Sequence, residues 1–179
     1  MEPIIIIENY YDKRTDVYQL LIKHSRSVAD KALSIARSHP EMDIDLAFIE
    51  EAAMLHDIGI FLCNAPEIGC HGTFDYICHG YLGADLLRKE GYPRHALVSE
   101  RHTGTGISLQ TVIEKNLPLP HKDFMPVSLE EQLICFADKF FSKTKPENEK
   151  DILQIQSSLQ KYGDETVLCF SRWCKLFLG

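Results

Sequence analysis

The chain has 179 residues, of which 45% are hydrophobic and 25% are charged, proportions typical of a globular protein with one core of useful size. The formal net charge of −7 argues against binding to a nucleic-acid duplex, because that partner requires clustered Lys and Arg. No apolar stretch is long enough to span a bilayer or to act as a signal peptide, so we expect no membrane association.

Two segments open the chain. The run Ile4–Ile7 lies between acidic residues, and we interpret it as a buried lead-in strand or arm. From Val17 onwards, apolar positions recur at intervals of three or four residues, which predicts an amphipathic helix. His24 lies on the inner face of this predicted helix, and Pro40 must end it.

The next helix carries an adjacent histidine and aspartate. Asp43 or Asp45 can cap its start, and its apolar face leads to His56–Asp57 before Gly59 stops it. Residues 61–78 contain proline and glycine without a helical period. We therefore expect a long loop close to the site, since long loops in compact domains are often functional.

Three short helices occupy the middle of the chain. His79 opens the first, which stops at Gly91–Pro93. The second starts at Arg94 and carries His102 before a glycine-rich break, and the third covers residues 108–115. Histidines therefore occur at the start of one predicted helix and near the end of another.

A proline-rich segment precedes the next helix. Residues 117–126 contain three prolines, which forbid a regular helix, so we expect an ordered loop or a lid. Ser128 and Glu131 then fit the Ser-x-x-Glu capping box, which predicts the start of a helix. Asp138 lies near the packed face of that helix.

The C-terminal part begins with a charged stretch, residues 143–150, interpreted as a solvated connector because acidic residues and a proline interrupt its lysines. Two helices, at 152–160 and 165–177, are expected to follow. The sequence therefore predicts an all-α, single-domain helical bundle over residues 1–179 with long loops near the site. Its core covers about residues 17–142, and a helical extension covers about 151–178.

Histidine and aspartate side chains at inner faces or ends of these helices suggest a two-metal centre. Borderline divalent metals bind imidazole nitrogen and carboxylate oxygen, and a two-metal site needs about three protein ligands per ion with one bridging carboxylate. An isolated inward histidine is more often a core residue, but this set would leave several buried polar groups unpaired without a metal. The candidate ligands are His24, His56, Asp57, His79, His102 and Asp138.

Within this set Asp57 is the natural bridge, while His24 and Asp138 complete one ion and His79 and His102 complete the other. Asp57 is thereby also a catalytic candidate. Iron or manganese are the first choices for the two divalent ions, with zinc, nickel, cobalt or magnesium as alternatives.

Three basic residues lie close to these candidates in the sequence. Lys139 follows Asp138 and Arg101 precedes His102, so either can hold a phosphate oxygen and stabilise charge that develops during phosphoryl transfer. We assign both residues catalytic and substrate-binding roles. Arg26 is a further candidate for substrate binding. The alternative for all three is a surface ion pair.

The remaining histidines and the cysteines are not assigned to the site. His39, His71, His95 and His121 lie beside prolines, in the glycine-rich loop or on a polar helix face, so we expect surface or loop positions. The six cysteines contain no Cys-x-x-Cys pair and show no basic partner at helical spacing, which argues against a catalytic thiol. Their scatter favours a reducing, cytoplasmic setting.

The motifs together resemble the HD superfamily of metal-dependent phosphohydrolases, in the variant with Ile-Gly after His-Asp (HDIG type). The resemblance rests on His24, on His56-Asp57-Ile58-Gly59 and on Asp138, and it covers about residues 17–142. The added His79 and His102 are similar to the binuclear, six-ligand branches of that superfamily. The resemblance implies an all-helical fold, metal-activated water and hydrolysis of a phosphoester or phosphoanhydride.

We therefore expect a metal-dependent phosphohydrolase that acts on a small phosphate ester or nucleotide. Two alternatives remain open. The same six-ligand pattern occurs in di-iron oxygenases of the superfamily, and a non-catalytic sensor that binds metal and nucleotide would need the same centre. The expected partner is a small phosphorylated molecule, and a homodimer is left open.

Overall fold

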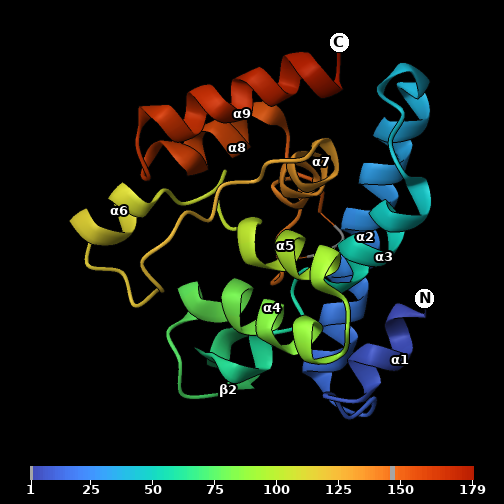
Figure 1. Cartoon of the computed structure of the whole chain (residues 1–179), viewed down its shortest axis with the longest axis vertical. Coiled ribbons are helices and arrows are strands. Elements are labelled where there is room, and N and C mark those ends of the chain that lie inside the picture. Colours follow the sequence, from blue (N-terminus) through green and yellow to red (C-terminus); the bar gives the residue numbers. More distant parts are fainter. Residues whose placement is uncertain (1, 146–147) are drawn as a thin grey trace.

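The computed structural model describes residues 2–145 and 148–179 (Figure 1). The α-helices in these residues are α1 (Pro3–Glu8), α2 (Asp16–Ser38), α3 (Leu46–Leu55), α4 (His79–Lys89), α5 (Pro93–Arg101), α6 (Leu109–Glu114), α7 (Leu129–Asp138), α8 (Ile152–Gln160) and α9 (Asp164–Phe177). The described β-structure consists of isolated bridges and one antiparallel pair of two-residue strands, β1 (Asn64–Ala65) and β2 (Cys70–His71). The prediction of an all-α fold is confirmed.

Helices α2, α3 and α7 each begin after a residue whose side chain caps the helix. The Thr15 side chain accepts a hydrogen bond from the backbone N–H of Tyr18 at the start of α2. Asp45, rather than Asp43, caps α3 by accepting from the N–H of Phe48. Ser128 caps α7 by accepting from the N–H of Glu131, whose own side chain turns back to the N–H of Val127 instead of completing the box.

The N-terminal isoleucine run is helical, so the prediction of a strand was wrong. Pro3 occupies the first turn of α1, where its missing N–H has no helical partner to lose. Ile6 and Ile7 are buried, whereas 60% of Ile5 is exposed. Four consecutive isoleucines carry no periodicity, so the sequence did not reveal which of them face the core.

Gly59 has a different role from the predicted helix stop. Helix α3 ends at Leu55, and Gly59 has a φ of −85°, outside the left-handed region. A Cβ atom on Gly59 would lie 2.3 Å from the carbonyl oxygen of His79 and 2.5 Å from the backbone nitrogen of Gly83. The glycine therefore allows the chain after α3 to pass against α4.

The two predicted loops are ordered by short elements and burial. Residues 60–78 form three 3₁₀ turns, at Ile60–Leu62, Pro66–Ile68 and Tyr76–Cys78, around the β1–β2 pair. Residues 117–126 bury Leu119 and Phe124 in a small apolar cluster with Val112 of α6. This second segment is also held by a hydrogen-bonded ion pair between Lys122 and the buried Glu100 of α5.

Two large apolar clusters lie on either side of the polar centre. Leu21 of α2 belongs to one and Val28 of the same helix to the other, with His24 between them. Leu55 and Ile58 likewise belong to the first cluster and flank His56–Asp57. The polar side chains are thus positioned at a boundary inside the packed bundle.

The C-terminal helices join this packing through aromatic contacts. The rings of Phe170 and Phe177 in α9 lie 5.2 and 5.4 Å, centroid to centroid, from that of Phe136 in α7. Burial of such side chains stabilises the fold by about 2–3 kcal/mol each.

None of the helices in the described ranges combines the length and apolar character required to cross a bilayer.

Candidate metal centre

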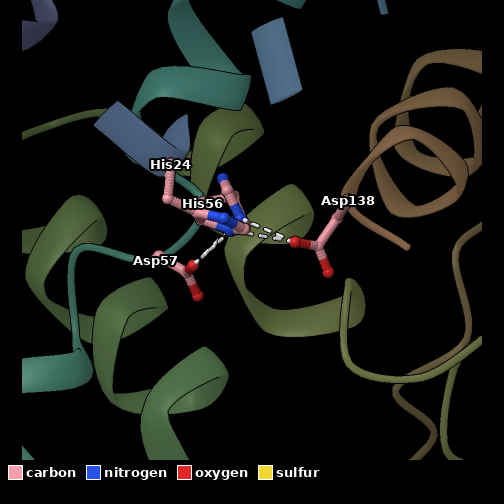
Figure 2. Close-up of side chains that lie close together, drawn as sticks. All are labelled: His24, His56, Asp57 and Asp138. Carbon is pink, nitrogen blue, oxygen red and sulfur yellow. Dashed lines mark hydrogen bonds and ion pairs between the residues drawn. The ribbon is translucent and has the colours of Figure 1, made fainter. Parts of the chain in front are cut away.

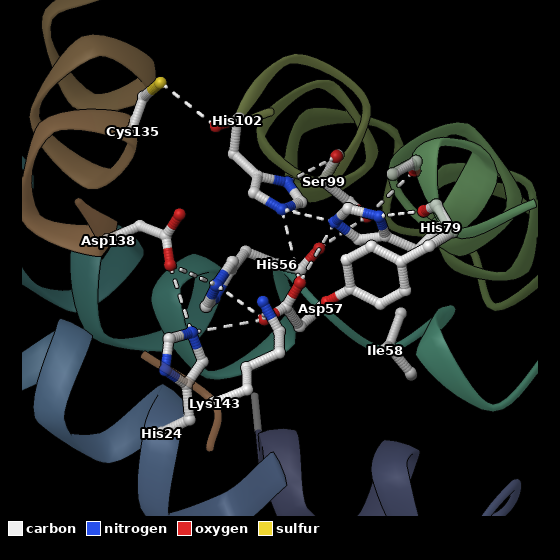
Figure 3. Close-up of polar contacts among 12 residues, drawn as sticks. His24, His56, Asp57, Ile58, His79, Ser99, His102, Cys135, Asp138 and Lys143 are labelled. Atoms are coloured by element: carbon white, nitrogen blue, oxygen red, sulfur yellow. Dashed lines mark hydrogen bonds and ion pairs between the residues drawn. The ribbon is translucent and has the colours of Figure 1, made fainter. Parts of the chain in front are cut away.

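The six candidate ligands come from five parts of the sequence and meet in the interior of the bundle (Figure 3). Five helices or their ends supply them, and all six side chains are buried. They form two overlapping groups whose ligand atoms lie within 4.8 Å of one another. The carboxylate-rich group consists of His24, His56, Asp57 and Asp138; the imidazole-rich group consists of Asp57, His79 and His102.

Three of the histidines are oriented by their own helix ends. Nδ1 of His56, His79 and His102 lies 2.6, 2.6 and 2.7 Å from the carbonyl oxygen three residues earlier. A carbonyl only accepts, so each Nδ1 carries the proton and donates it. Each Nε2 therefore faces the centre, with a free lone pair whenever the ring is neutral. This is the usual arrangement of a metal-binding imidazole with a backbone partner.

The imidazole-rich group fits a cation between its members. Nε2 of His79 lies 3.0 Å from Nε2 of His102, and both lie close to Oδ1 of Asp57, at 3.3 and 3.2 Å. With both Nδ1 atoms protonated, neutral rings turn two lone pairs toward each other at that distance. A divalent ion held by both nitrogens and the carboxylate would remove this repulsion.

The carboxylate-rich group places two imidazoles between two carboxylates (Figure 2). Nε2 of His24 lies 3.0 Å from Oδ1 of Asp138 and 3.2 Å from Oδ2 of Asp57. Nε2 of His56 lies 3.1 Å from the same Asp57 oxygen. Neither Asp57 oxygen nor Nε2 of His56 has a well-oriented hydrogen bond in the described residues. A bound metal ion would satisfy these buried polar atoms, which otherwise lack a well-oriented hydrogen bond in the described part of the chain.

Charge balance differs between the groups. Burial alone would lower the pKa of His56, but the carboxylates of Asp57 and Asp138 outweigh it and raise that pKa to about 9. Burial also lowers the pKa of His102, here to about 4, against the weaker effect of Asp57. Burial opposes ionisation of Asp57 and Asp138, yet the surrounding cationic groups hold the pKa of both well below 3.8.

Lys143 reaches this centre, so its predicted place in a solvated connector was wrong. Its Nζ lies 2.7 Å from Oδ2 of Asp57, and only 15% of its side chain is exposed (Figure 3). Burial disfavours the ammonium form, but Asp57 dominates and raises the pKa of Lys143 above its usual value. One sequence signal was available, since Phe140–Phe141 ties the start of the segment to the core.

Lys139 also lies at the centre. Its Nζ is 2.7 Å from Oδ2 of Asp138 and 3.2 Å from the carbonyl oxygen of His102. Burial lowers the pKa of Lys139, but Asp138 outweighs this effect and raises it. Lys139 and Lys143 together place two ammonium groups on the two carboxylates of the carboxylate-rich group.

The structure does not bring the two predicted arginines to the centre. An Arg101 guanidinium nitrogen lies 2.9 Å from Oε2 of the buried Glu131, so Arg101 ties α5 to α7. A guanidinium nitrogen of Arg26 lies 2.8 Å from Oε1 of Glu50, and both side chains are nearly half exposed. Arg26 therefore forms the surface ion pair that was the alternative for it.

Among the histidines left out of the ligand set, one is not on the surface as predicted. His95 is 9% exposed, its Nε2 lies 3.1 Å from Oε2 of Glu51, and its ring packs edge-on against Phe48. His39 is partly exposed, while His71 and His121 are exposed.

All six cysteines are free, and burial raises the pKa of Cys63 and Cys135 to about 12, so those thiols stay protonated.

The fold and this His/Asp cluster agree with a comparison against protein families, in which residues 21–142 match the HD domain. The chain belongs to the HD-domain family. This family implies membership of a superfamily of metal-dependent hydrolases, and together with the buried cluster it indicates divalent metal binding. The resemblance predicted from the motifs is confirmed.

Three of the matching curated relatives are one uncharacterized protein and two enzymes that carry the same name. The chain is 33% identical to an uncharacterized protein of Methanocaldococcus jannaschii, covering 75% of this chain and 73% of that protein. It is 32% identical to a tRNA (cytidine(56)-2'-O)-methyltransferase of Thermoplasma volcanium, covering 81% of this chain but 38% of that enzyme. The corresponding enzyme of Picrophilus torridus is 30% identical, with 87% and 39% covered. No solved structure gives a significant match.

Proposed function

We propose that this HD-domain protein is a phosphohydrolase that uses two divalent metal ions to hydrolyse a small phosphate ester or nucleotide. The observation that carries the proposal is the convergence of His56, His79 and His102 around Asp57. Each of these rings is held by a backbone carbonyl with Nε2 toward the centre. Such pre-orientation of buried imidazoles around a carboxylate suits metal ligation.

The two groups would hold one ion each. His24, His56 and Asp138 would hold one ion, His79 and His102 would hold the other, and Asp57, which contacts histidines of both groups, would be shared. We propose iron or manganese, with zinc, nickel, cobalt or magnesium as alternatives. When bound, the ions would supply Lewis acidity that activates water and polarises a phosphoryl oxygen.

Lys139 and Lys143 give the centre its preference for a phosphorylated substrate. Both ammonium groups line the cleft onto which Asp138 opens. There they can hold phosphate oxygens by charge-assisted hydrogen bonds and stabilise the negative charge of a phosphoryl-transfer transition state. Arg101 and Arg26 are left out of this role because neither lines this cleft, and each pairs with a carboxylate away from the ligand groups. The net charge of −7 continues to disfavour a nucleic-acid duplex.

The test is release of inorganic phosphate from a panel of nucleotides and sugar phosphates by the metal-depleted chain, with each metal added back separately. We expect metal-dependent release from at least one compound, under anaerobic conditions as well as in air. His102→Gln should lose most of this activity because it removes a metal ligand. His39→Gln serves as the matched control, since His39 is partly exposed and bonds to Glu41 and the Phe177 carbonyl.

Failure of every metal and substrate combination to release phosphate would contradict the proposal. Oxygen consumption by the iron-loaded protein, without phosphate release, would identify the oxygenase alternative. Tight nucleotide binding without turnover would identify the sensor.

A further inference from the structure

A broad cleft of about 1210 Å³ connects the metal centre to the C-terminal helices. The turn at residues 103–108, helix α6, the segment after α7, and helices α8 and α9 all contribute to its lining, and Asp138 is the ligand residue that opens onto it. In Figure 1, α6 lies at the same end of the molecule as α8 and α9. Typical small-molecule pockets hold about 300–1,000 Å³, so the cleft is larger than a monophosphate needs.

The cleft reverses the charge balance of the chain. The whole sequence has 19 Lys and Arg against 26 Asp and Glu. The cleft lining instead has six basic and four acidic residues. Among the acidic ones, Asp138 belongs to the metal centre, and Asp164 and Glu165 lie in the first turn of α9, where the helix dipole favours them. The basic residues of the lining are Lys115, Lys139, Lys143, Lys150, Lys161 and Arg172.

Two of these lysines are not committed to the metal centre and flank α8. Lys150 lies just before the helix and is partly buried, and Lys161 is the exposed C-cap residue. Lys150 forms no ion pair with any carboxylate of the described residues. Burial lowers the pKa of Lys150, Asp138 partly offsets this, and Lys139, Lys143 and Lys161 lower it further. Several ammonium groups thus share this part of the cleft, an arrangement that an anion would stabilise.

The lysines that flank α8 lie outside the family match. The HD domain covers residues 21–142, whereas Lys150, Lys161 and helices α8 and α9 follow it. The extension is nevertheless packed on the HD core through Phe170 and Phe177. A feature specific to this extension, added beside the catalytic groups, is suited to determining which substrate is accepted.

We propose that the α8–α9 extension forms a second anion subsite, in which Lys150 and Lys161 bind an anionic group of the substrate distant from the phosphate at the metal centre. The inference rests on the proposed function for the identity of the first phosphate. It narrows the substrate class to molecules with a second anionic group at a distance from the first phosphate, such as a nucleoside polyphosphate. A monophosphate would reach the metal centre and leave the second subsite empty.

The test is equilibrium binding, by calorimetry, of ATP and of AMP to the full chain depleted of metal, where no turnover is required. We expect ATP to bind roughly tenfold or more tightly than AMP. Lys150→Met and Lys161→Met should each weaken ATP binding about tenfold and leave AMP binding unchanged. Lys175→Met is the matched control, because this exposed lysine lies on α9 but does not line the cleft. It should leave ATP binding unchanged.

Equal affinity for ATP and AMP, or binding of neither, would overturn the second subsite. The same holds if the Lys150 and Lys161 variants behave like the Lys175 variant. Lys161 is exposed, so its substitution is expected to leave the fold intact and the result interpretable. A protein that prefers ATP through these lysines but releases no phosphate with any metal would retain this subsite and lose the proposed function. A protein that releases phosphate but shows no preference for ATP through these lysines would retain the proposed function and lose the second subsite.

Discussion

The two ligand groups share Asp57 yet balance charge in opposite ways. In the carboxylate-rich group, Asp138 adds a second carboxylate, and the pKa of His56 rises to about 9. In the imidazole-rich group, a single Asp57 oxygen faces two imidazoles, and the pKa of His102 falls to about 4. His56 and His102 have the same backbone support. The local number of carboxylates, rather than the helix end, therefore decides whether a metal must displace a proton at each site.

The largest effect is expected from Asp57→Asn, which removes the carboxylate that both groups share. An amide has no negative charge for either cation, so both equivalents of metal should be lost. Phosphohydrolase activity should fall roughly a thousandfold. Elemental analysis of the purified variant, alongside phosphate release, checks this. Retention of one full equivalent would show that the groups do not depend on a common carboxylate.

Single histidine substitutions separate the groups. His24→Gln should empty the carboxylate-rich group and His102→Gln the imidazole-rich group, so each variant should keep about one metal per chain. Activity should fall roughly a hundredfold in both, since catalysis would use both ions. Metal titration followed by calorimetry distinguishes the sites. Loss of both metals from either variant would mean that the centre assembles as one unit.

Lys143→Met tests whether the Lys143 ammonium group takes the place of a metal ion beside Asp57 when the carboxylate-rich group holds no metal. Removal of Lys143 leaves Asp57 buried with less compensation, so the free energy of unfolding of the metal-free protein should fall by about 3 kcal/mol. Metal should then bind more tightly, because no ammonium group competes for the carboxylate. Urea unfolding with and without metal measures both effects. If the free energy of unfolding is unchanged, the contact between Lys143 and Asp57 contributes little to stability and the prediction is wrong.

In the metal-free protein, the free energy of unfolding should depend on pH through one histidine of each ligand group. The raised pKa of His56 contributes stability below pH 6.5, which is lost as the pH rises toward 9. The lowered pKa of His102 contributes stability above pH 6.5, which is lost as the pH falls toward 4. Each contribution is on the order of 3 kcal/mol. Urea unfolding between pH 4 and 9 should show His102→Gln flattening the acid side and His56→Gln the alkaline side. If neither variant changes the pH profile of stability, the assignment of the acid side to His102 and of the alkaline side to His56 is contradicted.

Apart from α1, the helices followed from local sequence patterns, and so did the placement of the candidate ligands at inner faces and helix ends. Apolar positions at helical spacing placed His24 on an inner face, and caps and breaks placed His56, His79 and His102 at helix ends, because these patterns act within one or two turns. The positions that the sequence did not predict depend on distant contacts. Gly59 is required by the approach of α4, and the ring of buried His95 packs against Phe48 of another helix.

By itself, the sequence determined the all-α fold, the membership of the HD-domain family and the set of histidines and aspartates that meets in the core. The sequence also placed the cation of Lys139 beside Asp138, but only the tertiary structure decided which of the other cations accompany that set. It brought Lys143 to Asp57 and turned Arg101 and Arg26 toward other carboxylates. The physical reason is that a helix pattern constrains the direction of side chains along one element. The choice of ion-pair partner depends instead on distances and burial across elements that the pattern does not contain.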